Sequence, residues 1–314
     1  MNLAIILDPL DSLKIYKDST FAMMREAARR GHTLTVLEQH EIFVRDGVVQ
    51  ASNRELQLTG ETPHWYKLGA TRSTPLREFD AVLMRKDPPF DMEYLYATHL
   101  LQAAERQGAK VYNKPQALRD CNEKLAILQF SEFTAPTLVT REPQQVREFA
   151  AEHGDVILKP LDGMGGMGIF RLTPSDPNLG SILETQMQGG ARTMMVQRYI
   201  AEIVSGDKRI LLIDGEPVPY ALARIPQTGE TRANLAAGGR GEGRPLSDRD
   251  HWICAQVAPR LREMGLLFVG LDVIGDFLTE INVTSPTCAR ELDAQFGLDI
   301  GGDLMVAIER RLRR

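Results

Sequence analysis

The apolar segment LLFVGLDVIGDFLTEINVTSP, residues 266–286, constrains the fold of this chain more than any other. A turn near Gly275-Asp276 predicts a β-hairpin with Asp272 on the first strand and Glu280 and Asn282 on the second. Glu280 and Asn282 are two residues apart, so they face the same side of their strand. Two carboxylates and an amide oxygen are ligands that suit Mg²⁺. The segment therefore predicts a metal-binding hairpin.

The register of the hairpin decides whether the three side chains share one site. A two-residue loop at 275–276 pairs Asp272 with Thr279 and turns Glu280 to the opposite face. A three-residue loop at 275–277, or a β-bulge, pairs Asp272 directly with Glu280. Opposed carboxylates destabilise a strand pair unless a cation lies between them. The alternative interpretation is an ordinary hairpin with carboxylates on its exposed face, but the apolar flanks favour the metal site.

A Gly-rich segment, residues 163–168, follows a predicted strand that ends near Lys159. Glycine lets a backbone approach a phosphate closely and point several N–H groups at it. Lys159 can add a compact positive charge. The segment is neither a Walker A loop nor the start of a long helix, and a strand is predicted directly after it. It is therefore interpreted as a hairpin flap over phosphates, with an ordinary Gly-rich turn as the alternative.

Strands and helices alternate through residues 3–113, which predicts an α/β domain with an open, mostly parallel sheet. Residues 45–75 are polar and are interpreted as a hairpin insertion. A helix is predicted at about 122–132, before further strand and helix patterns. Residues 226–245 contain seven glycines or prolines and no apolar periodicity, which predicts a long lid loop.

The composition excludes several classes of function. With 37 basic and 42 acidic residues the net charge is −5, so nothing predicts a general attraction to nucleic acid or to an anionic membrane. The three cysteines are widely spaced without a CxxC motif, which argues against disulfides and zinc. Cys121, beside a predicted helix start, and Cys288 are interpreted as packed, inert thiols. No apolar run predicts a signal peptide or a membrane span, so a cytoplasmic location is expected.

Several basic residues stand at the ends of predicted elements, where they could recognise carboxylates or phosphates. Solvated surface positions are the alternative for most of them. That alternative is weakest for Arg85, which ends an apolar strand, and for Arg209, which begins one. The candidates are Arg85, Lys124, Arg209, Arg224, Arg232 and Arg240.

Five long segments together resemble the bacterial glutathione synthetases of the ATP-grasp superfamily. They are MRKDPPFD (84–91), NKPQALRDCNEKL (113–125), ILKPLDGMGGMGIFR (157–171), DGEPVPYALARIPQTGETRANLAAGGRGE (214–242) and FVGLDVIGDFLTEINVTSPT (268–287). The resemblance implies an N-terminal α/β domain followed by an ATP-grasp fold of two subdomains. The implied boundaries are 1–121 for the N-terminal domain, 122–200 for the small subdomain, and 201–314 for the catalytic subdomain with a flexible loop at 226–242.

The resemblance also implies a reaction. ATP would phosphorylate the cysteinyl carboxylate of γ-glutamylcysteine, and the amine of glycine would attack the acyl phosphate to give glutathione, ADP and phosphate. The implied cofactors are ATP and two Mg²⁺ ions, with Mn²⁺ as an alternative. The implied partners are these small molecules and further copies of the chain in a homotetramer, without nucleic acid or membrane.

The resemblance assigns roles to individual residues. The metal ligands are Asp272, Glu280 and Asn282, and the catalytic residues are Arg209, Arg232 and Gly239. The implied ATP-binding residues are Lys124, Lys159, Gly163, Gly165, Gly166, Gln197, Tyr199, Ile200 and Asp207. The implied substrate contacts are Lys17, Ser19, Arg85, Arg224, Arg232, Asn234 and Arg240. Arg198 departs from the family pattern, in which a neutral polar residue is expected.

Three other functions compete with this interpretation. A different ATP-grasp ligase, joining alanines or adding glutamate to a peptide, differs by its substrate alone. A nucleotide sensor without catalysis is disfavoured because the predicted metal triad is complete. A dinucleotide-binding oxidoreductase is disfavoured because Asp8-Pro9-Leu10 stands where a GxGxxG motif would follow the first strand.

Overall fold

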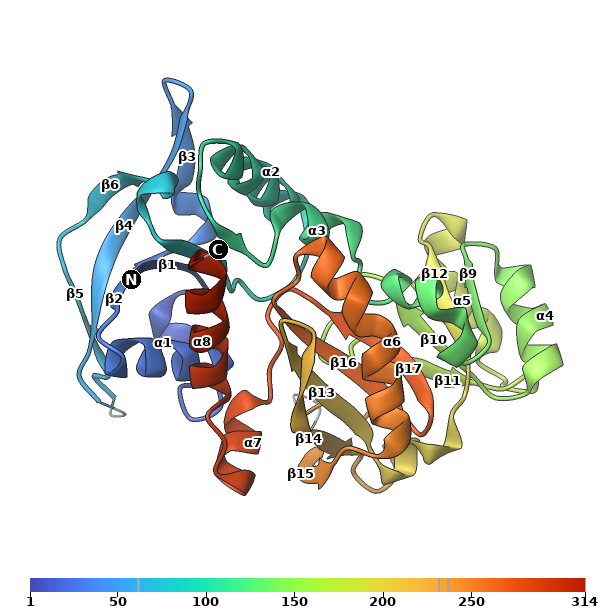
Figure 1. The fold of residues 1–314 in the computed structure, drawn as a ribbon. Coiled ribbons are helices and arrows are strands. Elements are labelled where there is room, and N and C mark those ends of the chain that lie inside the picture. Colours follow the sequence, from blue (N-terminus) through green and yellow to red (C-terminus); the bar gives the residue numbers. More distant parts are fainter. Residues whose placement is uncertain (61–62, 231, 236–237, 314) are drawn as a thin grey trace.

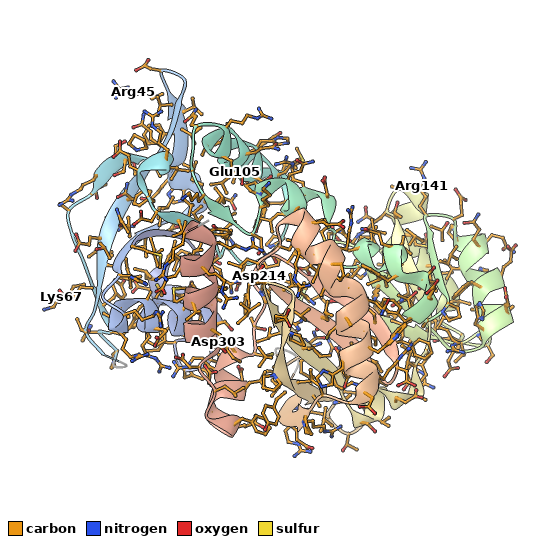
Figure 2. All side chains as sticks on the ribbon, viewed as in Figure 1. Arg45, Lys67, Glu105, Arg141, Asp214 and Asp303 are labelled. Atoms are coloured by element: carbon orange, nitrogen blue, oxygen red, sulfur yellow. The ribbon has the colours of Figure 1, made fainter. Side chains whose placement is uncertain are left out.

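Three β-sheets lie side by side in the protein, as Figure 1 shows, with the C-terminal sheet between the other two. The structure is a computed structural model that describes residues 1–60, 63–230, 232–235 and 238–313. Charged side chains cover the outer surface, for example Arg45, Lys67 and Arg141 (Figure 2). Among the described residues no helix is long and apolar enough to span a membrane.

The N-terminal sheet has eight strands in the order β3-β4-β2-β1-β7-β8, with β5 and β6 also paired to β4. The strands are β1 (Asn2–Ile6), β2 (Thr33–Leu37), β3 (Ile42–Arg45), β4 (Val48–Leu58), β5 (Tyr66–Leu68), β6 (Arg72–Pro75), β7 (Ala81–Met84) and β8 (Val111–Tyr112). The pairs that link β2, β1, β7 and β8 are parallel, as the sequence predicts. The antiparallel pairs all involve β4, so they coincide with the predicted hairpin insertion.

The helices of this domain are α1 (Ser19–Arg29), α2 (Met92–Arg106) and α3 (Pro115–Asp120). Helix α1 begins where the Asp18 carboxylate accepts a hydrogen bond from the Phe21 N–H at 2.6 Å, so Asp18 is its N-cap. The C-terminal helix α8 (Ile300–Leu312) lies against α1. Arg30 and Glu309 form an ion pair at 2.8 Å between the two helices. The two ends of the chain are therefore packed together.

The smallest sheet has the order β11-β10-β12-β9. Its elements are β9 (Thr137–Thr140), β10 (Val156–Pro160), β11 (Phe170–Leu172), β12 (Met194–Arg198) and the helices α4 (Pro143–His153) and α5 (Leu179–Met187). Apolar residues of both helices share one buried cluster with the strands, such as Val146, Leu183 and Leu158. The two helices therefore cover one face of this sheet and leave the other face for the site.

The segment before this sheet is an interrupted helix. A helix is predicted at about 122–132, and the structure has a 3-10 helix over Leu125–Phe133 that is interrupted by a kink. The backbone of Phe130 leaves the helical region, with φ −132° and ψ 44°, and its ring packs 5.5 Å from that of Phe133. The helix is therefore interrupted at Phe130, where the two aromatic rings pack against each other.

The third sheet has the order β15-β14-β13-β16-β17. Its elements are β13 (Asp207–Ile213), β14 (Glu216–Ile225), β15 (Arg240–Pro245), β16 (Phe268–Ile274), β17 (Phe277–Asn282) and the helices α6 (Asp248–Met264) and α7 (Ala289–Phe296). Ile210, Leu271 and Ile281 share a buried cluster with residues of α6. Asp207, Arg209 and the other residues that alternate with them face the opposite side.

The predicted lid, residues 226–245, is only partly a loop. Residues 240–245 form the edge strand β15, paired with β14 from Ile225↔Arg240 onward. The prediction of a loop at residues 240–245 was wrong. These residues show no alternation of apolar and polar side chains, and their hydrogen bonds to β14 form the strand instead. A Cβ atom on Gly243 would lie 2.2 Å from the Phe296 ring, and one on Gly241 would lie 3.2 Å from the Leu222 side chain, so the strand is tightly packed at both glycines. Residues 231 and 236–237 of the predicted lid lie outside the described residues.

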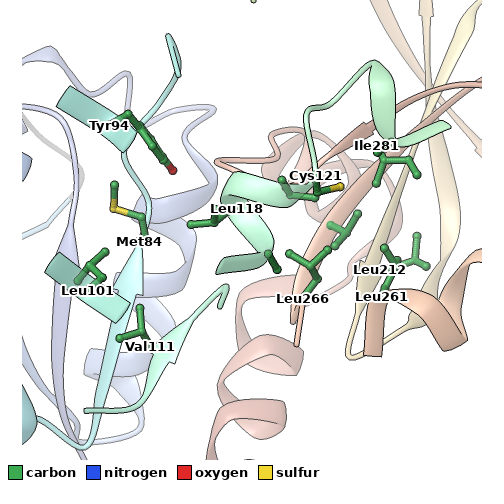
Figure 3. Packing of buried hydrophobic residues seen from close by; sticks show 14 of the residues in the cluster. Met84, Tyr94, Leu101, Val111, Leu118, Cys121, Leu212, Leu261, Leu266 and Ile281 are labelled. Carbon is green, nitrogen blue, oxygen red and sulfur yellow. The ribbon is translucent and has the colours of Figure 1, made fainter. Parts of the chain in front are cut away.

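A continuous apolar core joins the N-terminal and C-terminal sheets (Figure 3). Met84 and Leu101 belong to it on one side, Leu261 and Ile281 on the other, and Leu118 lies between them. All three cysteines are buried and free, and burial raises the pKa of Cys121 and Cys254 to about 12. The burial of Cys121 and Cys288 agrees with the prediction that they are packed thiols, and their lack of reactivity stays a prediction.

Candidate active site

A cavity of about 620 Å³ lies where the three parts of the chain meet. Residues of β10 and β12 line it from the smallest sheet, and residues of β13, β14, β16 and β17 line it from the C-terminal sheet. The segment 12–18 closes the end nearest the N-terminal sheet. One cavity therefore collects most of the residues that the sequence analysis singled out.

The metal-binding hairpin has the register that the prediction requires. Asp272 pairs with Glu280, whereas Val273 pairs with Leu278, so Thr279 is the extra residue of a β-bulge. The Thr279 hydroxyl donates a hydrogen bond to the Asp272 carbonyl at 3.1 Å. The bulge alternative is therefore confirmed, and Asp272, Glu280 and Asn282 line the same cavity.

Two buried arginines surround Asp272. Its carboxylate accepts hydrogen bonds from Arg209 at 2.5 and 2.9 Å and lies 2.8 Å from the Arg224 guanidinium. Burial opposes ionisation of Asp272, but the two guanidinium groups hold its pKa below the usual range. Arg224 also pairs with Asp207. This side of the site is a charge network built on adjacent strands.

Two buried lysines face Glu280. The Lys124 and Lys159 ammonium groups lie 3.6 and 3.7 Å from the same Glu280 oxygen. Lys124 also donates to the Gly163 carbonyl at 2.9 Å, which attaches it to the Gly-rich segment. Burial lowers the pKa of Lys159, and Glu280 opposes this effect. Paired buried cations beside a Gly-rich loop are suited to hold phosphates.

The donor set fits Mg²⁺. Asn282 donates its amide N–H to the Gly270 carbonyl at 3.3 Å, which leaves its amide oxygen available. One carboxylate oxygen of Asp207 is buried without a hydrogen-bond partner in the same cavity. In the part of the chain that the structure describes, no group of three His, Cys, Asp or Glu residues could hold a metal. Mg²⁺ would therefore need Asn282 and substrate phosphates as well.

The Gly-rich segment connects the antiparallel strands β10 and β11, so the predicted hairpin is confirmed. Gly166 has φ 85°, and a Cβ atom there would lie 2.9 Å from the Asn234 amide oxygen and 3.3 Å from the Arg232 side chain. The flap and the lid therefore meet over the cavity, at a position where only glycine fits.

The predicted adenine side of the cavity is apolar. Tyr199 and Ile200 line it at the end of β12, together with Ile157, Ile203 and Ile274. The Gln197 side chain donates to the Thr137 hydroxyl at 2.9 Å. The unexpected Arg198 lies over the Phe277 ring, 5.5 Å from its centroid. Arg198 therefore has a packing partner within the protein.

Two predicted substrate contacts are buried next to the cavity but are not among the described residues that line it. Arg85 donates to the Thr20 hydroxyl at 3.1 Å and to the Pro286 carbonyl at 3.3 Å. The Ser19 hydroxyl accepts a hydrogen bond from the Ala289 N–H at 3.3 Å. Both residues attach the N-terminal domain to the segment after β17, so they hold two walls of the cavity together.

Two predicted lid residues also lie off the cavity wall. The Arg240 side chain is 73% exposed and pairs with Glu242 at 3.2 Å. A Cβ atom on Gly239 would lie 2.1 Å from the Ala233 carbonyl oxygen, so the tight backbone of the lid requires glycine there. Arg232, Asn234 and Lys17 do line the cavity. The roles of Gly239 and Arg240 stay predictions.

Several acidic residues of the cavity were not predicted from the sequence. Glu123 accepts a hydrogen bond from the Thr284 hydroxyl at 3.0 Å, and burial, with a smaller effect from Glu280, raises its pKa. Glu291 of α7 and Asp87 line the opposite end. Glu123 is next to Lys124 in the sequence, whereas Asp87 and Glu291 have no such signal. Tertiary contacts create the environments of all three.

This combination of a Gly-rich flap, buried lysines and a carboxylate hairpin around one cavity defines an ATP-grasp ligase. Family models of the prokaryotic glutathione synthetase match nearly the whole chain, the N-terminal domain at residues 1–119 and the ATP-grasp domain at residues 123–297. The chain belongs to the prokaryotic glutathione synthetase family.

Relatives agree with this assignment. The chain is 57% identical to the glutathione synthetase of Pseudomonas putida over 100% of this chain and 99% of the relative. It is 59% identical to that of Ralstonia nicotianae, over 99% and 96%. Among solved structures, D-cycloserine synthetase matches with a TM-score of 0.70 at 15% identity, over 99% and 100% of the two chains. The ATP-grasp ligase PsnB, complexed with minimal precursor, Mg and ADP, matches with a TM-score of 0.63 at 21% identity, over 99% and 98%. The structural matches support the fold.

Proposed function

We propose that this enzyme joins γ-glutamylcysteine and glycine to form glutathione, with conversion of ATP to ADP and phosphate. The observation that carries the proposal is the pairing of Asp272 with Glu280 across a bulged hairpin, facing the buried Lys124 and Lys159. This arrangement concentrates positive charge and hard oxygen ligands where a triphosphate would lie. Family membership supplies the identity of the carboxylate and amine substrates.

The reaction has two steps. A cysteinyl carboxylate oxygen attacks the γ-phosphorus of ATP, and the bond from that phosphorus to the ADP oxygen breaks. The glycine amine then attacks the carbonyl carbon of the acyl phosphate, phosphate leaves with the bonding electrons, and the nitrogen loses a proton. A free carboxylate is a poor electrophile, and water would hydrolyse the acyl phosphate. The chain must therefore neutralise phosphate charge and exclude water.

The residues of this chain divide these tasks. Lys124 and Lys159 hold the phosphates, and Arg209 stabilises the transferring phosphoryl group. The flap at 163–168 and the lid residues Arg232 and Asn234 cover the reacting groups, since they already meet at Gly166. Gln197, Tyr199 and Ile200 bind the adenine, and Asp207 binds the ribose. Lys17 and Arg224 contact the peptide or its acyl phosphate.

Asp272, Glu280 and Asn282 would hold Mg²⁺. When bound, the metal neutralises charge on the β- and γ-phosphates and polarises them toward attack. We propose that two metal ions bind, with Mn²⁺ as an alternative to Mg²⁺.

We also propose that the chain forms a homotetramer in the cytoplasm. Its proposed domains are residues 1–121, 122–200 and 201–314.

Phosphate release tests the proposal. The enzyme should release phosphate with γ-glutamylcysteine, ATP and Mg²⁺, and glycine should raise the steady rate because it consumes the acyl phosphate. Glu280→Gln should lower turnover roughly 10³-fold, because loss of a metal-ligand charge removes several kcal/mol of transition-state stabilisation. Release that is independent of γ-glutamylcysteine, or fastest with D-alanine, would sink the proposal. Full activity of Glu280→Gln would refute the position of the metal.

A further inference from the structure

The end of the cavity nearest the N-terminal sheet contains a carboxylate oxygen without a partner. Glu291 lines the cavity from the first turn of α7, and its Oε2 atom is buried and accepts no hydrogen bond from the described residues. A buried carboxylate oxygen without a donor is costly, so such atoms usually have a ligand or water to bind. The unpaired Glu291 oxygen is therefore positioned to accept a hydrogen bond from a bound ligand.

The other carboxylates at this end are engaged, with one exception. Asp8 pairs with Lys86 at 2.6 Å and accepts from the Asp87 N–H at 2.9 Å. Asp18 caps α1 through Phe21. Asp87 lines the cavity too, but its carboxylate is not among the buried unpaired atoms. Glu291 is therefore the strongest acceptor left in this part of the cavity, and Asp87 is its competitor.

The substrate offers a matching donor. In the proposed reaction the cysteinyl carboxylate of γ-glutamylcysteine lies at the phosphate end of the cavity. The other end of the peptide carries an α-ammonium group and an α-carboxylate. Lys17 lines the same cavity and supplies a cation there. Burial raises the pKa of Glu291, and the charge of Lys17 opposes this effect. A carboxylate and an ammonium group side by side can bind the two opposite charges of an amino-acid head.

We propose that Glu291 binds the α-ammonium group of the γ-glutamyl moiety and thereby makes the enzyme specific for peptides with that free amine. This inference rests on the proposed function, because it needs γ-glutamylcysteine in the cavity. A charge-assisted hydrogen bond in a buried site discriminates strongly against a ligand that lacks the donor. The structural alternative is that Glu291 only stabilises the first turn of α7 through the helix dipole.

A comparison of two substrates separates these roles. Glutarylcysteine matches γ-glutamylcysteine except that it lacks the ammonium group. Wild-type enzyme should prefer γ-glutamylcysteine by roughly 10- to 100-fold in kcat/KM, measured as glycine-dependent phosphate release. Glu291→Gln should remove most of this preference and leave kcat/KM for glutarylcysteine nearly unchanged. A purely structural role would lower kcat/KM for both substrates together.

Matched variants complete the experiment. Glu93→Gln also removes an acid from the first turn of a helix, on the exposed side of α2, and should keep the wild-type preference. Collapse of the preference in Asp87→Asn instead of Glu291→Gln would overturn the assignment, as would an unchanged preference in Glu291→Gln. If wild-type enzyme does not turn over γ-glutamylcysteine at all, the proposed function fails and the inference falls with it. Turnover with an unchanged preference refutes the inference alone.

Discussion

The two ends of the cavity treat buried charge in opposite ways. At the phosphate end, Asp272 is held between Arg209 and Arg224, and Glu280 faces two lysines. At the peptide end, Glu291 keeps an oxygen without a partner. The carboxylates of the first arrangement are paired with cations of the protein, although one Asp207 oxygen beside them is also buried without a partner. No cation of the described residues is paired with Glu291 in this way, so it has room for a cation from outside. The phosphate end is thus preorganised, and the peptide end is left open for recognition.

The two ends of the cavity differ because they are built from different kinds of secondary structure. The phosphate end is built on neighbouring strands, where β13, β16 and β17 place residues opposite one another in fixed register. Arg209, for example, pairs with Asp272 across β13 and β16. The peptide end combines a loop, a helix and the segment 12–18, which come from distant parts of the chain. Pairing between strands places several charged side chains opposite one another at fixed distances. Elements from distant parts of the chain do not share such a register.

The largest effect is expected from Asp272→Asn. Asparagine keeps the size but cannot neutralise Arg209 and Arg224, so buried cations remain with only Asp207 to pair them. The free energy of unfolding should fall by about 3–5 kcal/mol, and phosphate release should become hard to detect. Urea denaturation at pH 7 measures the first effect. Asp303→Asn, exposed on α8 (Figure 2), is the control and should leave the denaturation midpoint in place.

Lys159→Met tests whether the two ends are separate. Methionine fills a similar volume without charge, so the affinity for ATP with Mg²⁺ should fall roughly 10- to 100-fold. Affinity for γ-glutamylcysteine should stay within about twofold, because the peptide head lies at the other end. Calorimetric titration with each ligand measures both values. An equal loss for the two ligands would contradict the division of the cavity.

Asp207 provides a pH test within the phosphate end. Burial raises its pKa from 3.8 to about 7, although Arg224 opposes the shift. The folded state thus keeps a proton that the unfolded chain has already lost. Its contribution to stability is full below pH 3.8 and is lost as the pH rises to about 7, at up to roughly 1.4 kcal/mol per pH unit.

Comparison with Asp207→Asn isolates this contribution from those of other groups. Urea denaturation at several pH values between 4 and 8 gives the stability of both proteins. The advantage of the wild-type protein should shrink steadily up to about pH 7 and stay constant above it. A constant difference over the whole range would mean that Arg224 outweighs burial and keeps Asp207 charged.

The sequence could predict most of the phosphate end, because strand parity and turn chemistry are local properties. The spacing of Asp272, Glu280 and Asn282 already required an odd loop or a bulge, and Thr279 provides the bulge. The Gly-rich flap was recognisable for the same reason. The boundaries of the strands and of α1 follow from apolar runs and an N-cap, which also act over a few residues.

The peptide end could not be predicted in this way. Glu291 becomes an unpaired buried acid only when α7 packs against segment 12–18, contacts that no spacing in the sequence encodes. Arg85 was recognised as unusual, yet its position behind the cavity wall depends on Pro286, far along the chain. The strand β15 was missed because its pairing partner, rather than its side-chain pattern, makes it a strand.

The smallest effect is expected from an unpaired polar atom outside the cavity. Tyr94 is fully buried in the core with Phe90, and its hydroxyl group has no hydrogen-bond partner among the described residues (Figure 3). Because no bond is lost, Tyr94→Phe should change the free energy of unfolding by less than about 1 kcal/mol, with stabilisation as the expected sign. Turnover and the preference for the free amine should not change. A loss of turnover in Tyr94→Phe would show that an unpaired polar atom outside the cavity also serves the reaction. The lack of a partner would then no longer indicate that Glu291 binds the substrate.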